Sequence, residues 1–118
     1  MTPRSFATVF SGRDHEAVLL DGTRLNLFVR QLPARFHVDF IVRQGNEADL
    51  LEFVCRPAVG EAPLEPGWAD ALSDKSHAEL LSIAKEINLA RAIATVERAN
   101  AVAKMLMPLQ PPGQTSTT

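Results

Sequence analysis

The stretch VLLDGTRLNLFVRQLPAR (18–35) contains the turn signal around which the expected fold is arranged. Asp21 and Gly22 favour a type I′ turn, because both central residues of that turn need a positive φ, which Asp and Gly tolerate best. Apolar residues then alternate with polar ones and put one face of a strand on a core: Leu25, Leu27 and Val29. The stretch therefore predicts an antiparallel hairpin, entered over 17–20 and left over 25–30.

A third strand is predicted upstream of the hairpin. Phe6, Thr8 and Phe10 also alternate, and the sequence Ser-Gly-Arg-Asp at 11–14 is favourable for a turn. The predicted β-rich region covers 5–31 and forms either a hairpin alone or a three-stranded antiparallel meander.

Two patterns conflict in the segment that follows. Four apolar residues alternate as they would in a strand: Phe36, Val38, Phe40 and Val42. Pro33, however, suits the first turn of a helix. Gly45 and Asn46 could end that helix and cap the next one, or could turn a hairpin. We favour a helix over 34–44.

The rest of the chain is predicted to be mainly helical. Asn46 is a good N-cap for a short helix, because acidic residues fill the following turn and an apolar stripe comes next, so the helical region extends over 34–56. Three prolines and two glycines make 57–67 a loop. A second helical region covers 73–107.

Within this second region we expect a helical hairpin. Ser73 or Asp74 can cap its first helix, and Ser76 and Glu79 have the spacing of a capping box. Asn88 can break the helix or recap it. The second helix then has one apolar side, formed by Leu89, Ala92, Ile93, Val96, Ala99, Ala103 and Leu106.

The composition fits one domain of the α+β class. A chain of 118 residues with 46% hydrophobic residues can form one modest core, over 1–107, and the polar, proline-rich 108–118 is expected to be a flexible tail.

The net charge of −2 gives no positive field for nucleic acid or anionic membranes, and no stretch approaches the roughly 20 apolar residues of a membrane span. We expect neither of these partners. The lone Cys55 suggests a buried residue and a reducing cytoplasm.

No group of residues predicts a reaction. Long intervals separate the three histidines, His15, His37 and His77, and no spacing of a metal site occurs. The polar residues over 73–79 contain the types of a nucleophilic triad, but they are better explained as helix caps. Asp70 and Asp74 are expected to be solvated, and no glycine-rich nucleotide motif is present. We therefore predict no catalytic residue, cofactor or metal, and hence no enzyme.

Two features could instead bind a partner macromolecule. Trp68, after Pro66 and Gly67, could anchor an interface, although we favour its packing the loop onto the core. The run LLSIAKEINLARAIATVERA (80–99) is similar to a DNA-binding helix-turn-helix, but Asn88 stands where that motif usually has Gly and the second helix offers few cations. A helical hairpin that packs on itself or on a partner fits better.

Three segments in order resemble small tail assembly chaperones of long-tailed bacteriophages and their prophages: VLLDGTRLNLFVRQLPARF, NEADLLEFVC and GWADALSDKSHAELLSIAKEINLARAIATVERANA. The resemblance covers about 18–106. It implies a non-enzymatic factor of the host cytoplasm that binds the long helical tape-measure protein and recruits tail-tube subunits. Alternatives are a small structural component of the tail or virion, and a helix-turn-helix-like regulator.

Surplus apolar residues near the end of the helical region suit such a partner helix, although self-association into a homo-oligomer could bury them equally well. The predicted partner-binding residues are Trp68, Ile93, Val96, Val102, Met105, Leu106 and Met107.

Overall fold

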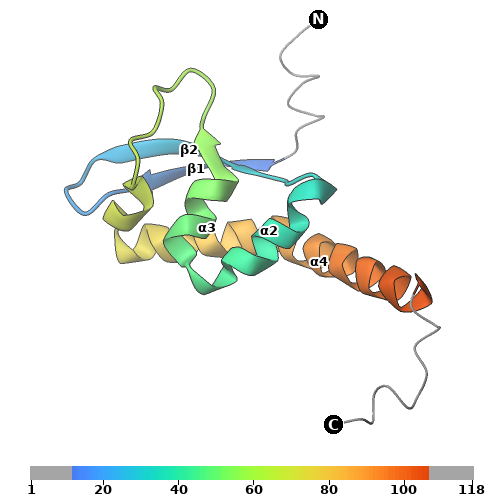
Figure 1. Cartoon of the computed structure of the whole chain (residues 1–118). Helices are drawn as coiled ribbons and strands as arrows, with labels where there is room; N and C mark the ends of the chain where they lie inside the picture. Colours follow the sequence, from blue (N-terminus) through green and yellow to red (C-terminus); the bar gives the residue numbers. More distant parts are fainter. Residues whose placement is uncertain (1–11, 107–118) are drawn as a thin grey trace, which may run out of the picture.

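A three-stranded antiparallel sheet lies beside one long helix in the computed structural model, which describes residues 12–106 (Figure 1). The strands are β1 (Gly12–Val18), β2 (Arg24–Arg30) and β3 (Cys55–Pro57), in the spatial order β1-β2-β3. The expected α+β class, with a sheet followed by a mainly helical half, is confirmed. The third strand comes from the end of the predicted helical region 34–56 and the start of the predicted loop 57–67. The strand expected around Phe6 to Phe10 lies outside the described residues.

The β1–β2 hairpin is present, but its turn is not type I′. Gly22 has a φ of 89°, whereas no other residue type among those described has a positive φ, so Asp21 does not take the conformation that type I′ requires. The Gly22 N–H donates to the Leu19 carbonyl at 2.9 Å, and the Leu19 N–H donates to that of Thr23 at 2.8 Å. These bonds fit a three-residue loop that ends in a left-handed glycine. The Asp21 carboxylate accepts the Thr23 N–H at 2.9 Å and thereby fixes the loop.

The predicted turn at 11–14 is wrong, because Gly12 already belongs to β1. A Cβ at Gly12 would lie 2.4 Å from the Val29 carbonyl oxygen and 2.5 Å from the Phe28 ring. Glycine is needed here for close approach: it lets the Phe28 ring lie over the neighbouring strand.

Two short helices connect the hairpin to β3. The favoured helix over 34–44 is confirmed as a 3₁₀ turn (Ala34–Phe36), α2 (His37–Val42) and a second 3₁₀ turn (Arg43–Gly45). Helix α3 (Glu47–Val54) follows, and the Asn46 side chain caps it by accepting the Asp49 N–H at 3.2 Å. After β3 the loop leads to a 3₁₀ turn at Trp68–Ala71.

The predicted helical hairpin is wrong, because α4 (Asp74–Leu106) is one uninterrupted helix of 33 residues. The Ser73 hydroxyl caps it by accepting the Ser76 N–H at 3.3 Å. The predicted capping box of Ser76 and Glu79 is also wrong: the Ser76 hydroxyl accepts the Val18 N–H at 2.8 Å, and the Glu79 carboxylate faces His15. Since 80–99 contains no turn, it does not form the helix-turn-helix on which the DNA-binding alternative depended.

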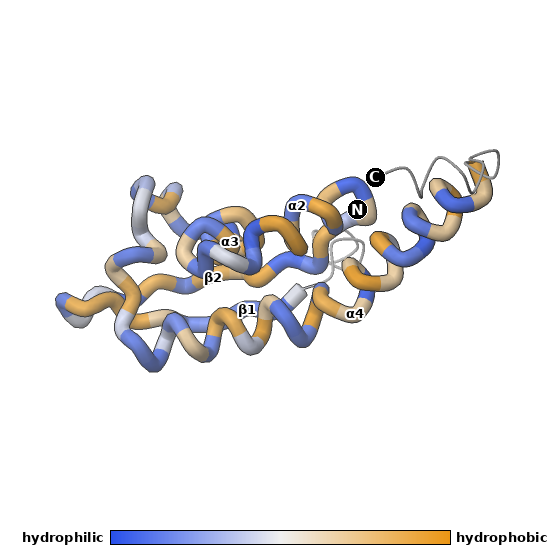
Figure 2. The backbone as a smooth tube through the Cα atoms, turned by 60° about the horizontal axis from the view of Figure 1, so that its bottom comes forward, coloured by the Kyte–Doolittle hydropathy of each residue, from blue (hydrophilic) through white to orange (hydrophobic). Residues whose placement is uncertain are grey.

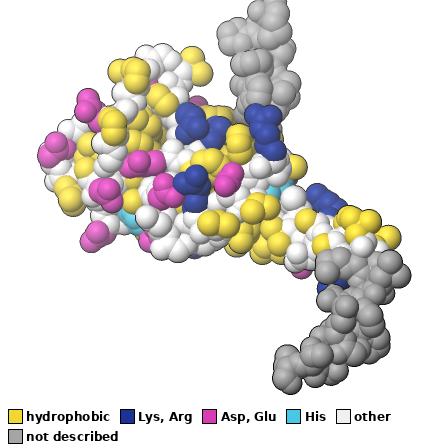
Figure 3. Space-filling view, in the orientation of Figure 1, with side chains coloured by type: hydrophobic (Ala, Val, Ile, Leu, Met, Phe, Trp, Pro, Cys, Tyr) yellow, Lys and Arg dark blue, Asp and Glu magenta, His cyan; other side chains and the backbone are white. Residues whose placement is uncertain are grey.

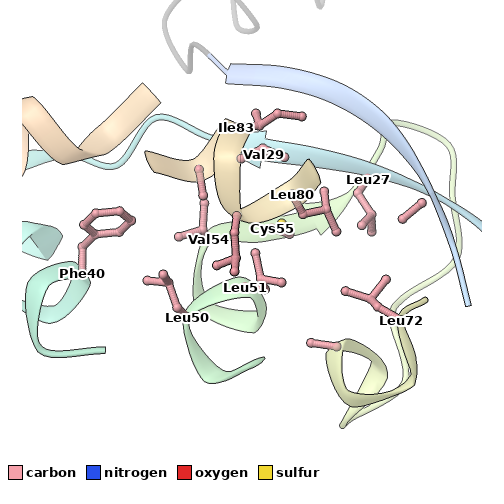
Figure 4. Packing of buried hydrophobic residues seen from close by; sticks show 14 of the residues in the cluster. Leu27, Val29, Phe40, Leu50, Leu51, Val54, Cys55, Leu72, Leu80 and Ile83 are labelled. Atoms are coloured by element: carbon pink, nitrogen blue, oxygen red, sulfur yellow. The ribbon is translucent and has the colours of Figure 1, made fainter. Parts of the chain in front are cut away.

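The core lies between the inner face of the sheet, α3 and the first half of α4 (Figure 4). Leu27, Val29 and Cys55 face it from the sheet, as the alternation had predicted for β2. Helices close it with Leu50, Leu51, Val54, Leu80, Ile83 and Ala84, and Phe40 joins it from α2. None of the helices within 12–106 has the length and apolar character of a bilayer span.

Candidate protein-interaction surfaces

Asn88 anchors the middle of α4 to the chain that leaves the sheet. Its side chain is completely buried, and Oδ1 accepts the Leu32 N–H at 2.7 Å. Nδ2 donates to the Arg30 carbonyl at 2.9 Å and to the Ala84 carbonyl, one turn back, at 3.1 Å. Asn88, which was expected to interrupt the helix, thus bonds backbone groups at and beyond the end of β2, and α4 continues without a break at this residue.

A second set of bonds holds α4 to α2 at the same place. The Leu32 carbonyl accepts from Arg91 Nη1 at 3.0 Å and faces His37 Nε2 at 3.2 Å. Because a carbonyl can only accept, His37 Nε2 carries the donated proton, which leaves Nδ1 to bond the Thr95 hydroxyl at 2.6 Å. The helix is therefore fixed as far as Thr95.

Beyond this anchor, α4 continues past the body of the protein (Figures 1 and 2). Ala92 is the last buried residue of the helix, and every side chain from Glu97 to Leu106 is exposed. Exposed large apolar residues remain on this end of α4: Ile93 is 43% exposed, Val102 53%, Met105 74% and Leu106 76%. We call 93–106 the projecting end. Apolar side chains gather over α2 and again over part of the projecting end (Figure 3).

The apolar stripe of α4 alternates spacings of three and four residues into the projecting end. Its members are Leu89, Ala92, Val96, Ala99, Ala103 and Leu106. This spacing keeps side chains on one side of a helix and is the pattern of helices that pack along another helix. The protein covers the stripe at Ala92, partly covers Val96, and leaves it uncovered from Ala99 onward. Small residues in its centre would allow a partner helix to approach closely.

The predicted contact residues therefore fall into separate groups. Ile93, Val102, Met105 and Leu106 lie on the projecting end, and Val96 is half-buried at its start. Met107 lies outside the described residues.

Trp68 differs from these residues because it is 7% exposed and belongs to the core cluster. Its ring is buried in the core, as favoured from the sequence, and is not offered to a partner. A cavity of about 320 Å³ lies between that loop, Trp68, Leu19 and Leu25. The sequence indicated the loop, but no local pattern indicated a cavity beneath it.

A group that sequence reasoning missed surrounds the end of α3, here named the arginine–phenylalanine cluster: Arg30, Arg35, Phe36, Arg43, Phe53 and Arg56. The Phe36 and Phe53 rings meet edge to face with centroids 5.6 Å apart. The guanidinium carbon of Arg43 lies 4.5 Å from the Phe53 centroid, and that of Arg35 lies 4.8 Å from the Phe36 centroid. Such distances are those of cation–π contacts.

Several ionisable side chains outside this cluster form ion pairs of their own. Arg13 meets Glu86 at 3.1 Å, and this contact lowers the pKa of the Glu86 carboxyl. His15 lies 3.2 Å from Glu79, and His77 lies 2.9 Å from Glu47. Within 12–106, no three His, Cys, Asp or Glu side chains are placed to hold a metal ion.

Cys55 is 1% exposed, and burial raises the pKa of its thiol to about 12. Since the thiolate is the reactive form, we expect no labelling of the native protein by a thiol reagent at pH 8 and rapid labelling in urea. The ordinary pKa is 9.0, so the folded state should lose stability as the pH rises from 9.0 toward about 12. Fast labelling under native conditions at pH 8 would contradict the burial of this thiol.

No protein-family model, curated protein sequence or solved structure matches this chain.

Proposed function

We propose that this protein is a non-enzymatic assembly chaperone of a long bacteriophage tail. It binds the helical tape-measure protein through the projecting end of α4, keeps that protein soluble, and helps to recruit tail-tube subunits around it. It acts in the host cytoplasm. The observation that carries the proposal is the exposed apolar end of a helix whose first half is rigidly anchored in the core.

A long helical client suits this surface chemically. Helices recognise one another through apolar residues repeated every three or four positions, and the stripe of α4 has that repeat. Met105 adds a flexible side chain that can adapt to different partner shapes. A client that exposes an apolar face before tail assembly could bury that face against the projecting end. The resemblance of three sequence segments, taken in order, to tail assembly chaperones supports the same kind of client.

The test is co-expression with the tape-measure protein encoded in the same genome. We expect the wild-type chain to co-purify with it and to raise its soluble fraction. Substitution of both Val102 and Leu106 by serine should reduce the recovered client severalfold, because these exposed residues supply apolar contact area.

The matched control replaces two exposed polar residues of the same helix segment, Glu97 and Lys104, by serine. This variant makes the same number of serine substitutions and should retain the client. A client that is equally soluble without the chaperone, or equally well bound by the Val102 and Leu106 variant, would refute the proposal. Detection of the chain in purified particles would favour a structural component instead.

A further inference from the structure

The arginine–phenylalanine cluster contains three arginines that pair with no carboxylate within residues 12–106. Arg43 pairs with Asp49, but among the described residues no carboxylate forms an ion pair with Arg30, Arg35 or Arg56. All 14 Asp and Glu residues of the sequence lie within 12–106, so no acidic side chain outside the described part could supply the missing charge.

Two of these arginines are held close together. Arg30 Nη2 and Arg56 Nη1 both donate to the Phe53 carbonyl, and Arg30 Nε donates to the Val54 carbonyl at 3.1 Å. Burial and then the charge of Arg56 lower the pKa of Arg30, as expected for neighbouring like charges. The nearby Glu52 carboxylate accepts the Ala69 N–H at 3.2 Å, while only its main-chain carbonyl bonds to Arg56.

Capping of α3 explains part of this arrangement. Arginine side chains can satisfy the last carbonyls of a helix and favour its negative end. One arginine would suffice for the Phe53 carbonyl, however, and a guanidinium has five N–H donors. Arg56 uses only Nη1 in the bonds described, which leaves the donors on Nε and Nη2. Arg35 is exposed, and its described contact is with the Phe36 ring.

We infer that the arginine–phenylalanine cluster is a docking site for an acidic segment of a partner protein, whose carboxylates bind Arg56 and Arg35 beside the half-buried Phe36 and Phe53 rings. Guanidinium groups match carboxylates in a planar, two-bond geometry. The cluster shares no residue with the projecting end of α4, and the inference does not depend on the function proposed for that end.

Charge complementarity selects an acidic protein segment over nucleic acid. A nucleic acid presents a continuous row of phosphates, and its binding needs many cations on one surface. Here three arginines that form no ion pair with any described residue lie on a protein of net charge −2, and the carboxylates of Asp39 and Asp49 lie on the neighbouring helices. A few carboxylates on a short segment suit such a local positive site better.

The test uses the full chain and a fluorescein-labelled peptide of about twelve residues with four glutamates and two leucines. A twin peptide with glutamine in place of glutamate is the ligand control. We expect fluorescence anisotropy to show binding of the glutamate peptide only, and added salt to weaken it. Arg56→Gln should weaken binding about tenfold, because it removes charge-assisted hydrogen bonds. Arg35→Gln should weaken it about threefold, in keeping with its exposed position.

Arg24→Gln is the matched protein control, because Arg24 is exposed at the other end of β2. It should bind the glutamate peptide as the wild type does. Circular dichroism melting checks that each variant is folded. Equal binding of both peptides, no loss with folded Arg56→Gln, or preferred binding of duplex DNA would overturn the inference. A dimer of the free wild type that Arg56→Gln dissociates would also overturn it, since a second copy would then occupy the site.

Discussion

Replacement of Asn88 by alanine is expected to lower the free energy of unfolding by about 4 kcal/mol. The substitution leaves the Leu32 N–H and the Arg30 carbonyl without their partner, and each unsatisfied buried group costs about 1–3 kcal/mol. The cavity left by the shorter side chain adds to this cost. Because small domains are stable by only about 5–15 kcal/mol, the variant should melt at a much lower temperature. Urea unfolding followed by circular dichroism measures the effect.

Two further variants separate the causes. Asn88→Leu keeps four side-chain heavy atoms branched at the same carbon but makes no hydrogen bonds, so it should destabilise the fold nearly as much as alanine if hydrogen bonding dominates. Asn100→Ala makes the alanine substitution at an exposed position of the same helix, where the change should stay within about 0.5 kcal/mol. An Asn88→Ala protein that loses less than about 1 kcal/mol would show that α4 does not depend on this anchor.

Asn88 also shows why the sequence predicted some parts of the fold and missed others. The hairpin and α3 depend on local signals, namely alternation, a glycine turn and the Asn46 cap, and these were recognised. In the sequence, Asn88 resembles a helix breaker because asparagine competes with helical hydrogen bonds. Its partners Arg30 and Leu32 lie 58 and 56 residues away in the sequence, so a rule that considers only neighbouring residues cannot predict these hydrogen bonds.

The sheet and the turn were mispredicted for similar reasons. β3 has only three residues, too few to show an alternation, and it exists because Cys55 pairs with Val29. Asp21-Gly22 was correctly identified as a turn, but the dipeptide fits two loop geometries, and the hydrogen bond between Leu19 and Thr23 selects the three-residue one.

The candidate surfaces differ in the same way. The stripe of α4 was visible in the sequence because it repeats along one helix. Only the structure shows that the stripe is buried or partly buried as far as Val96 and exposed beyond it. The arginine–phenylalanine cluster could not be predicted from spacing. Its arginines come from β2, from the 3₁₀ turns before α2 and α3, and from β3, and only folding brings them around Phe36 and Phe53.

Leucine at both Ala99 and Ala103 is expected to weaken binding of the tape-measure protein about a hundredfold, if the projecting end packs along a client helix as proposed. Both alanines lie in the centre of the stripe, where small side chains set the distance between two helices. Two isobutyl side chains in place of two methyl groups would overpack that contact by about 3 kcal/mol. Both positions are exposed in the free protein and leucine favours helices, so the melting temperature should not change.

Ala101→Leu provides the matched control, because Ala101 is exposed on the opposite side of the same helical turns. Binding of immobilised tape-measure protein, measured by biolayer interferometry, should remain at the wild-type level for this variant. If leucine at Ala101 weakens binding as much as leucine at Ala99 and Ala103, the client does not recognise the stripe. If the double variant binds more tightly, the client leaves space above the alanines, and close packing at this position is ruled out while client binding itself stands.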